Sequence, residues 1–173
     1  TITVNPTPTV ADPADQVVCN NAPTNGVIFS GSSSGTTFNW ANDNPPVGLP
    51  ATGTGNIGAF TAANTGSTEV NAIVTVTPFA NGCAGDSQAF NIAVNPTPTV
   101  TATPVTQTIC SGTAITQIDI SNPNDVAGTI FSWARTNTTN LTGIAASGTG
   151  TSISGILDNN TSIQQTTTFT ITA

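Results

Sequence analysis

The chain has 173 residues, only 5% of them charged, and one basic residue against eight acidic ones gives a formal net charge of −7. It contains no histidine and no lysine, which excludes imidazole catalysis, imidazole metal ligation and Schiff-base chemistry. A single arginine cannot neutralise the phosphates of a nucleic acid or of an anionic membrane surface, and no apolar run is long enough to cross a bilayer. Composition therefore predicts a non-catalytic protein that neither binds nucleic acid nor inserts into a membrane.

An internal repeat is the most informative feature of the sequence. The string Val-Asn-Pro-Thr-Pro-Thr-Val occupies residues 4–10 and recurs unchanged at residues 94–100. Four later landmarks recur in the same order, about 91 to 95 residues apart. They are Cys19 and Cys110, Phe38-Asn39-Trp40 and Phe131-Ser132-Trp133, Gly53-Thr54-Gly55 and Gly148-Thr149-Gly150, and residues 74–77 and 169–172. A period near 90 residues suits one small β-sandwich domain rather than a solenoid unit.

Alternating apolar and polar residues predict β-strands along the chain. In chain order, the apolar positions that share a face are Phe38 and Trp40, then Val70, Ala72, Val74 and Val76, then Phe90, Ile92 and Val94, then Phe131 and Trp133, and finally Phe169 and Ile171. Asn-Gly at 25–26 and 81–82 and Asn-Pro-Pro at 44–46 punctuate these runs as turns. No amphipathic helix of useful length is present. The sequence predicts an all-β protein made of tandem Ig-like Greek-key β-sandwiches.

The repeat also predicts the domain organisation. Residues 1–5 are interpreted as the last strand of a preceding repeat, residues 6–97 as a complete Ig-like repeat, and residues 98–173 as a second repeat truncated before its last turn and strand. The chain is accordingly expected to be an internal window of a longer protein. The linker Asn95-Pro96-Thr97-Pro98 is expected to be stiff, because its prolines fix an extended backbone and remove hydrogen-bond donors. Repeats joined in this way are expected to form a rod, each adding roughly 40 Å.

Residues 53–58, Gly-Thr-Gly-Asn-Ile-Gly, match the dinucleotide-binding fingerprint. That motif requires a following helix, whose N-terminus meets the pyrophosphate, whereas residues 59–66 have the pattern of a strand and a turn. The second repeat keeps only the first two glycines, Gly148 and Gly150. A structural turn that leads into a strand is therefore the better interpretation.

The three cysteines present a choice between free thiols and disulfides. Thiols pair in extracellular proteins, and the composition of this chain is extracellular in character. We therefore predict a disulfide between Cys19 and Cys83. On the chain-entropy model, closing this loop would stabilise the fold by roughly 4 kcal/mol. Cys110 is expected to be unpaired here, with its partner further along the parent chain.

The aromatic and acidic residues each have two interpretations. Phe38, Trp40, Phe131 and Trp133 recur at equivalent strand positions, which favours core packing between the sheets over a sugar-stacking surface. Asp12 and Asp15 are the candidates for a calcium ion at a repeat junction, but they lack the alternating acidic spacing of a calcium loop, so a solvated surface is the simpler interpretation. No other cofactor is expected.

Together these motifs resemble the PKD-like and Ig-like tandem repeats of very large surface proteins from bacteria with type IX secretion. The resemblance covers the whole chain. It rests on the first cysteine of each repeat, Phe-x-Trp, Gly-Thr-Gly, Val-Thr-Val-Thr-Pro at 74–78, Gly-Cys-x-Gly at 82–85 and the closing Val-Asn-Pro-x-Pro. It implies a stalk or fibre segment of an extracellular, cell-surface adhesin, of the kind used in gliding motility.

Two classes of function are consistent with these features. In the first, the repeats are structural, protease-tolerant spacers that hold a distal adhesive region away from the cell, with neighbouring repeats, or other copies in a fibre, as partners. In the second, each repeat binds surface glycans or proteins through its loops, and many weak contacts together give adhesion. Exposed aromatic residues would favour the second class and buried ones the first.

Overall fold

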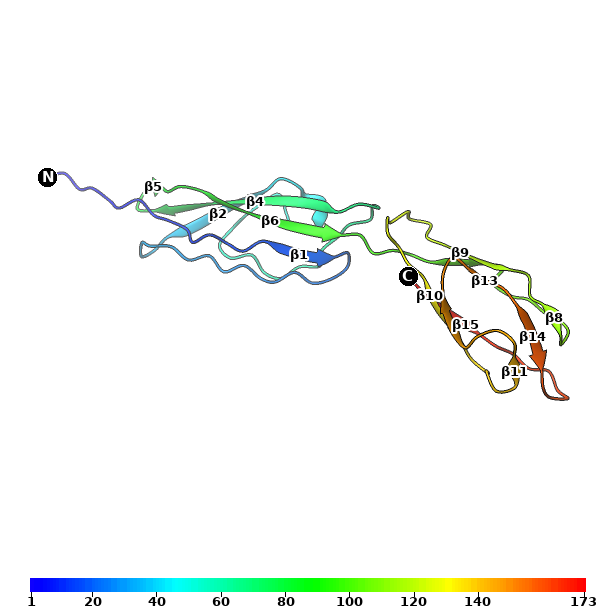
Figure 1. Ribbon diagram of the computed structural model, residues 1–173. Coiled ribbons are helices and arrows are strands. Elements are labelled where there is room, and N and C mark those ends of the chain that lie inside the picture. Colours follow the sequence, from blue (N-terminus) through cyan, green and yellow to red (C-terminus); the bar gives the residue numbers. More distant parts are fainter. The chain divides into compact units, whose positions relative to one another are not determined.

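The computed structural model describes residues 1–173, which divide into two compact units, Thr1–Thr97 and Pro98–Ala173. Both units consist of β-strands and turns, and the single helical element is a short 3-10 turn, η1 (Pro45–Val47) (Figure 1). The predicted all-β class is therefore confirmed. No helix in the structure has the length and hydrophobicity that a membrane crossing requires.

One six-stranded sheet dominates the first unit. Its strands lie in the order β1-β6-β4-β2-β3, with β5 paired to one end of β4. β1 runs parallel to β6, and the other pairs are antiparallel. The strand bounds are β1 Gln16–Cys19, β2 Thr37–Asn42, β3 Thr52–Thr54, β4 Val70–Ala80, β5 Cys83–Ala84 and β6 Gln88–Asn95.

The sequence of β4 explains its central place in this sheet. Ala72, Val74 and Val76 are completely buried, whereas the side chains between them are exposed or half-buried, so one face of the strand enters the core. Beyond β4, Asn81 and Gly82 both adopt positive φ angles and return the chain into β5. The alternation in the sequence thus corresponds to burial on one side of a strand that is paired on both edges.

A second, less regular layer covers the buried face of this sheet. Isolated bridges join Pro23 to Thr61 and Val27 to Ile57. The residues of the two layers form one hydrophobic core: Val10, Phe29, Phe38, Trp40, Val47, Leu49, Ile57, Ala62, Ala72, Val74, Val76, Phe90, Ile92 and Val94. The first unit is therefore a two-layer β-sandwich.

The second unit is built from three short, three-stranded sheets. Their strand orders are β12-β10-β15, β11-β14-β8 and β13-β9-β7. The bounds are β7 Thr101–Thr103, β8 Thr113–Ala114, β9 Ile118–Ser121, β10 Ser132–Arg135, β11 Leu141–Thr142, β12 Ser147–Thr149, β13 Ser152–Ile153, β14 Ile156–Asn159 and β15 Phe169–Thr172. Its core consists of Ile118, Ile120, Phe131, Leu141, Ile144, Ile153 and Leu157. Strands β10 and β12 carry the same landmarks as β2 and β3, so both units share one plan.

The first fifteen residues form no strand. Pro8 and Val10 are buried against the first unit, which anchors the segment, while Ile2 and Val4 are 92% and 87% exposed. Figure 1 shows the N-terminal end extending away from the body of the first unit. The expectation that residues 1–5 belong to the strand system of another repeat remains a prediction.

Candidate functional site

Each unit places a tryptophan directly over a glycine on the neighbouring strand. Trp40 on β2 lies opposite Gly53 on β3, and Trp133 on β10 lies opposite Gly148 on β12. A Cβ atom added to Gly53 would lie 2.1 Å from Cζ2 of Trp40, and one added to Gly148 would lie 2.5 Å from Cζ2 of Trp133. The indole ring therefore fills the space that any larger residue would need. The repeated Gly-Thr-Gly is a packing requirement of the tryptophan.

The predicted core aromatic residues lie at different depths. Phe38, Trp40 and Phe131 are buried, whereas Trp133 is half-buried and packs edge-on against Phe169, with ring centroids 5.7 Å apart. The indole Nε1 atoms of both tryptophans are buried without a hydrogen-bond partner. Phe38 and Trp40 belong to the core of the first unit and Phe131 to that of the second, and Trp133 packs against the second core.

A buried polar side chain follows each tryptophan by two residues. In the first unit, Asn42 is 5% exposed, and its Nδ2 donates to the carbonyl oxygen of Leu49 at 2.8 Å. In the second unit the corresponding residue is Arg135, which is 8% exposed. Its Nε and Nη2 donate to the carbonyl oxygens of Ile144 at 3.0 and 2.6 Å, and Nη2 also donates to that of Leu141 at 3.0 Å. Both side chains thus hold the loop after the tryptophan strand.

A glutamine clamp is repeated in the same way. In the first unit, Gln16 Nε2 donates to Asn25 O at 3.1 Å, and Asn25 N donates to Gln16 Oε1 at 2.8 Å. In the second unit, Gln107 and Thr116 make the same two bonds, at 2.8 and 2.7 Å. The clamp therefore matches Gln107–Cys110 to β1 residue by residue.

The predicted Cys19–Cys83 disulfide is wrong, and all three cysteines are free. Cys19 lies opposite Asn95, beside the end of β4 that starts at Val70. Cys83 pairs with Ala80 at the other end of β4. At about 3.3 Å per residue, this strand separates the two thiols by roughly 30 Å, whereas a disulfide needs Cα atoms within about 7 Å of each other.

The acidic candidates for calcium binding do not gather into a ligand set. Asp12 is exposed, and Asp15 Oδ1 accepts a hydrogen bond from the backbone N–H of Asn91 at 2.6 Å. No group of three or more Asp, Glu, Cys or His side chains is close enough together to hold a metal ion. The carboxylate of Asp15 instead ties the start of β1 to β6.

The first residues of the predicted linker are held by the first unit. Asn95 ends β6, and its carbonyl oxygen accepts a bond from Asn20 N at 2.8 Å. Thr97 Oγ1 donates to the carbonyl oxygen of Asn20 at 3.3 Å. Pro96 follows the strand directly, and the boundary between the two units falls at the peptide bond before Pro98. Two of the four residues are therefore fixed by hydrogen bonds to the first unit.

Sequence reasoning missed the role of Arg135. It recognised this residue only as the one basic side chain, and the natural expectation for an arginine is an exposed position. The signal that could have found it is positional, since Arg135 follows Trp133 at the spacing at which Asn42 follows Trp40. That spacing places both residues on the core face of their strands.

The class of protein defined by this architecture is a tandem pair of Ig-like β-sandwiches. A solved structure described as DIP-gamma IG1+IG2 is similar in fold, with a TM-score of 0.50 and 8% identity over 96% of this chain and 95% of that one. Weaker likenesses, with TM-scores of 0.41 and 0.42 and 9% identity each, are to protocadherin gamma B7 cadherin domains 1–4, covering 88% of this chain and 41% of that one, and to the CsuC–CsuE chaperone–tip adhesion subunit complex of Acinetobacter baumannii, covering 95% and 99%.

The family is shown by the sequence. The PKD-like domain family matches residues 16–98 and again residues 107–173, one match in each unit, and the chain therefore belongs to that family. A search of curated protein sequences gives no match. The predicted PKD-like and Ig-like repeats are thus confirmed as the fold and family. Domains of this kind typically serve as extracellular adhesion or structural modules without catalytic activity.

Proposed function

We propose that this chain is a non-catalytic stalk segment of a repetitive, extracellular cell-surface adhesin, whose repeats hold a distal adhesive region away from the cell. The observation that carries the proposal is the bracing common to both units. Each unit has a tryptophan over a glycine, a buried polar side chain two residues after the tryptophan, and a glutamine clamp. The features that recur in both units are therefore contacts that stabilise each unit from within.

The chemistry of the surface supports the same function. The repeated aromatic residues Phe38, Trp40, Phe131 and Trp133 pack in or against the cores, and the acidic residues are dispersed. With no histidine or lysine and one glutamate, the chain carries few groups that could bind or transform a ligand. A spacer needs none of these groups.

Resistance to proteolysis is the property that an exposed spacer needs most. The chain contains a single residue after which a trypsin-like enzyme cuts, Arg135, and this side chain is 8% exposed and bonded to three carbonyl groups. The resemblance to repeats of type IX-secreted surface proteins suggests the setting, a surface adhesin of the kind used in gliding motility.

The experiment is an adhesion assay on cells that display one, two or four copies of the chain between a surface anchor and a biotin-binding tip. A spacer predicts that capture of biotinylated beads rises with copy number, because the tip clears the cell surface, and that chains without the tip capture nothing. Tip-less chains that adhere to glycan- or protein-coated beads in proportion to copy number would instead show a binding module.

A further inference from the structure

The strands that begin and end the first unit lie side by side and run in the same direction. β1 pairs with β6 in parallel over four positions, from Gln16 opposite Ile92 to Cys19 opposite Asn95. β1 is the first strand of the chain, and β6 is the last strand of the first unit. Every other pair of strands in this sheet is antiparallel. The chain therefore enters this pair at one end and leaves it at the other (Figure 1).

This arrangement determines how tension along the chain acts on the first unit. Tension pulls β1 from its N-terminal end, ahead of Gln16, and pulls β6 from its C-terminal end, after Asn95. Because the strands are parallel, the two pulls act along the strands in opposite directions, so the strands must slide past each other. The evenly spaced hydrogen bonds of a parallel pair then share the tension. Strands that are pulled apart at adjacent ends lose their bonds one at a time instead.

Further hydrogen bonds extend this pair beyond both ends of β1. Ahead of β1, Asp15 Oδ1 accepts a bond from the backbone N–H of Asn91 at 2.6 Å. After β1, Asn20 N donates to the carbonyl oxygen of Asn95 at 2.8 Å, and Thr97 Oγ1 donates to that of Asn20 at 3.3 Å. The bonded segments therefore reach from Asp15 to Asn20 and from Asn91 to Thr97. We call this contact the β1–β6 ladder.

The core side of the β1–β6 ladder is shielded from water. Ile92 and Val94 are 0% exposed, and Val18 packs against the same core. Asn64, which is 5% exposed, is bonded to both segments. Its Nδ2 donates to the carbonyl oxygen of Val94 at 2.7 Å, and its backbone N–H donates to Asn20 Oδ1 at 2.8 Å. Hydrogen bonds beside a packed core must break before water can replace them, which raises the barrier to separating the strands.

Tension from the N-terminal side meets no other ladder before β1. The residues ahead of β1 form no strand. They are held by scattered contacts: Ala11 N donates to the carbonyl oxygen of Ser30 at 2.9 Å, Asn5 Nδ2 donates to that of Asn81 at 3.0 Å, and Pro8 is buried. The β1–β6 ladder is therefore the first place at which several backbone bonds resist the pull together.

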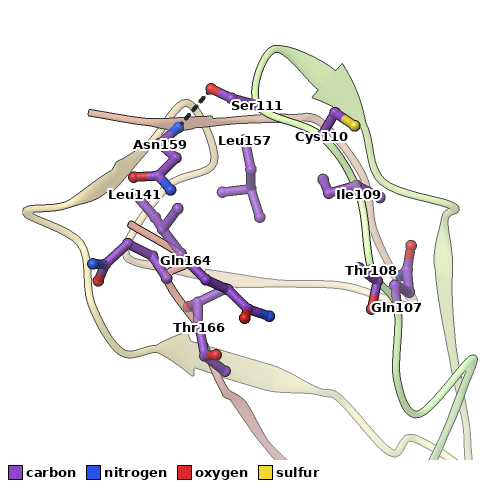
Figure 2. Close-up of a pocket in the computed structure, with 12 residues that line it drawn as sticks. Gln107, Thr108, Ile109, Cys110, Ser111, Leu141, Leu157, Asn159, Gln164 and Thr166 are labelled. Carbon is purple, nitrogen blue, oxygen red and sulfur yellow. Dashed lines mark hydrogen bonds between the residues drawn. The ribbon is translucent and has the colours of Figure 1, made fainter. Parts of the chain in front are cut away.

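The second unit has no ladder at the corresponding place. Gln107–Cys110, which the glutamine clamp matches to β1, pair with no strand. A pocket of about 310 Å³ lies between them and residues 164–167. Figure 2 shows Ile109 on one side of this pocket and Gln164 on the other. The same chain thus contains one unit with the ladder and one without it, which gives a force measurement an internal reference.

We propose that the β1–β6 ladder is a mechanical clamp, which keeps the first unit folded while tension passes along the chain. The proposal goes beyond the stalk function, because a spacer has only to hold two points apart, whereas a clamp resists a pull between them. Forced unfolding is governed by the barrier to unfolding and not by equilibrium stability. The clamp can therefore be measured separately from stability and from adhesion: a chain that failed as a spacer would still show direction-dependent resistance if the clamp is present.

Direction is tested by single-molecule force spectroscopy of the whole chain in a Cys83→Ser/Cys110→Ser background. One sample is held by tags ahead of Thr1 and after Ala173, which pulls the ladder along its strands. The other is held by the exposed thiol of Cys19 and the same C-terminal tag. Because Cys19 lies opposite Asn95, this second pull separates β1 and β6 at adjacent ends.

The first unit is expected to open at a force at least about twofold higher in the first sample, because its bonds share the tension there and break singly in the second. The second unit is pulled in the same way in both samples and should open at an unchanged force. Equal opening forces for the first unit in the two samples overturn the proposal.

The bonds themselves are tested by two proline variants on β1. Asn20 N donates to β6, and ladder bonds recur at every second residue, so Val18 N–H also faces β6 and Val17 N–H faces the open side of β1. Val18→Pro removes a donor from the ladder and should lower the opening force of the first sample toward that of the Cys19 sample. Val17→Pro, at a side chain that is 69% exposed, is the matched control and should keep the native force.

Val18→Ala separates the lost side chain from the lost bond, since it keeps the N–H, and it should lower the force much less than Val18→Pro. A folded Val18→Pro chain that opens at the native force contradicts the clamp, as does an equal loss in Val17→Pro. The comparison of pulling directions needs no substitution in β1 or β6, so it decides the matter if Val18→Pro does not fold.

Discussion

Trp40 and Gly53 face each other across β2 and β3, and the indole ring occupies the space where a side chain at Gly53 would lie. The same relationship holds for Trp133 and Gly148. The glycine is therefore required by the packing of its neighbour, although its own φ angle is ordinary. This one contact joins two of the sequence landmarks, Phe-x-Trp and Gly-Thr-Gly, into a single structural unit.

Replacing Gly53 by alanine should destabilise the first unit by about 1–3 kcal/mol, because the ring must move to admit the new methyl group. Calorimetric or urea unfolding measures the change. Gly58→Ala is the matched control, since nothing lies within 4 Å of a Cβ atom there and its φ angle is not positive. A loss that is equal in the two variants would show that the cost comes from the backbone and not from Trp40.

Trp40→Ala should cost about 3–5 kcal/mol, because it empties part of a buried core. Phe79→Ala, at a side chain that is 36% exposed on the other face of β4, should cost much less. The readouts are the unfolding midpoint and bead adhesion. A Trp40 variant that keeps its melting temperature but loses a binding activity would assign the ring to a ligand surface.

Arg135→Lys should destabilise the second unit by about 2–4 kcal/mol even though the charge is kept. The planar guanidinium donates to the carbonyl groups of Leu141 and Ile144 together, and a single ammonium group cannot reproduce that geometry. Asn42→Ala, which removes the corresponding bond in the first unit, should cost about 1–3 kcal/mol. Separate transitions for the two units in calorimetry would show each loss in its own unit; a loss in the other transition contradicts the assignment.

The double substitution Cys19→Ser/Cys83→Ser should change the free energy of unfolding by less than about 1 kcal/mol. Neither thiol is bonded to the other, and neither side chain is fully buried. A disulfide enclosing that loop would instead be worth roughly 4 kcal/mol, and thiol titration of the unfolded native chain should find three reactive groups. If the titration found only one reactive thiol and the double variant lost much of its stability, Cys19 and Cys83 would be shown to form a disulfide.

The sequence was most informative where a strand is buried on one face and paired on both edges. Alternation predicted the positions of β4 and β6, because their core face must be apolar at every second residue. It could not show that Cys19 and Cys83 lie at opposite ends of the sheet, since the order of strands along the chain does not say which ends meet. It also did not show that Arg135 is buried. The side chain donates to backbone carbonyl groups, and these acceptors are present whatever the residue type. The strands of the three small sheets in the second unit are too short to show a clear alternation of apolar and polar residues.

Limited proteolysis with trypsin tests the central claim, that these repeats are protease-tolerant spacers, most directly. The chain can be cut only after Arg135, whose side chain is buried and bonded to the loop that follows it. In native buffer the chain should stay intact, and across a urea series it should be cut into two fragments, 1–135 and 136–173, in step with unfolding of the second unit. Cleavage after Arg135 in native buffer at the rate of the unfolded chain would contradict the account.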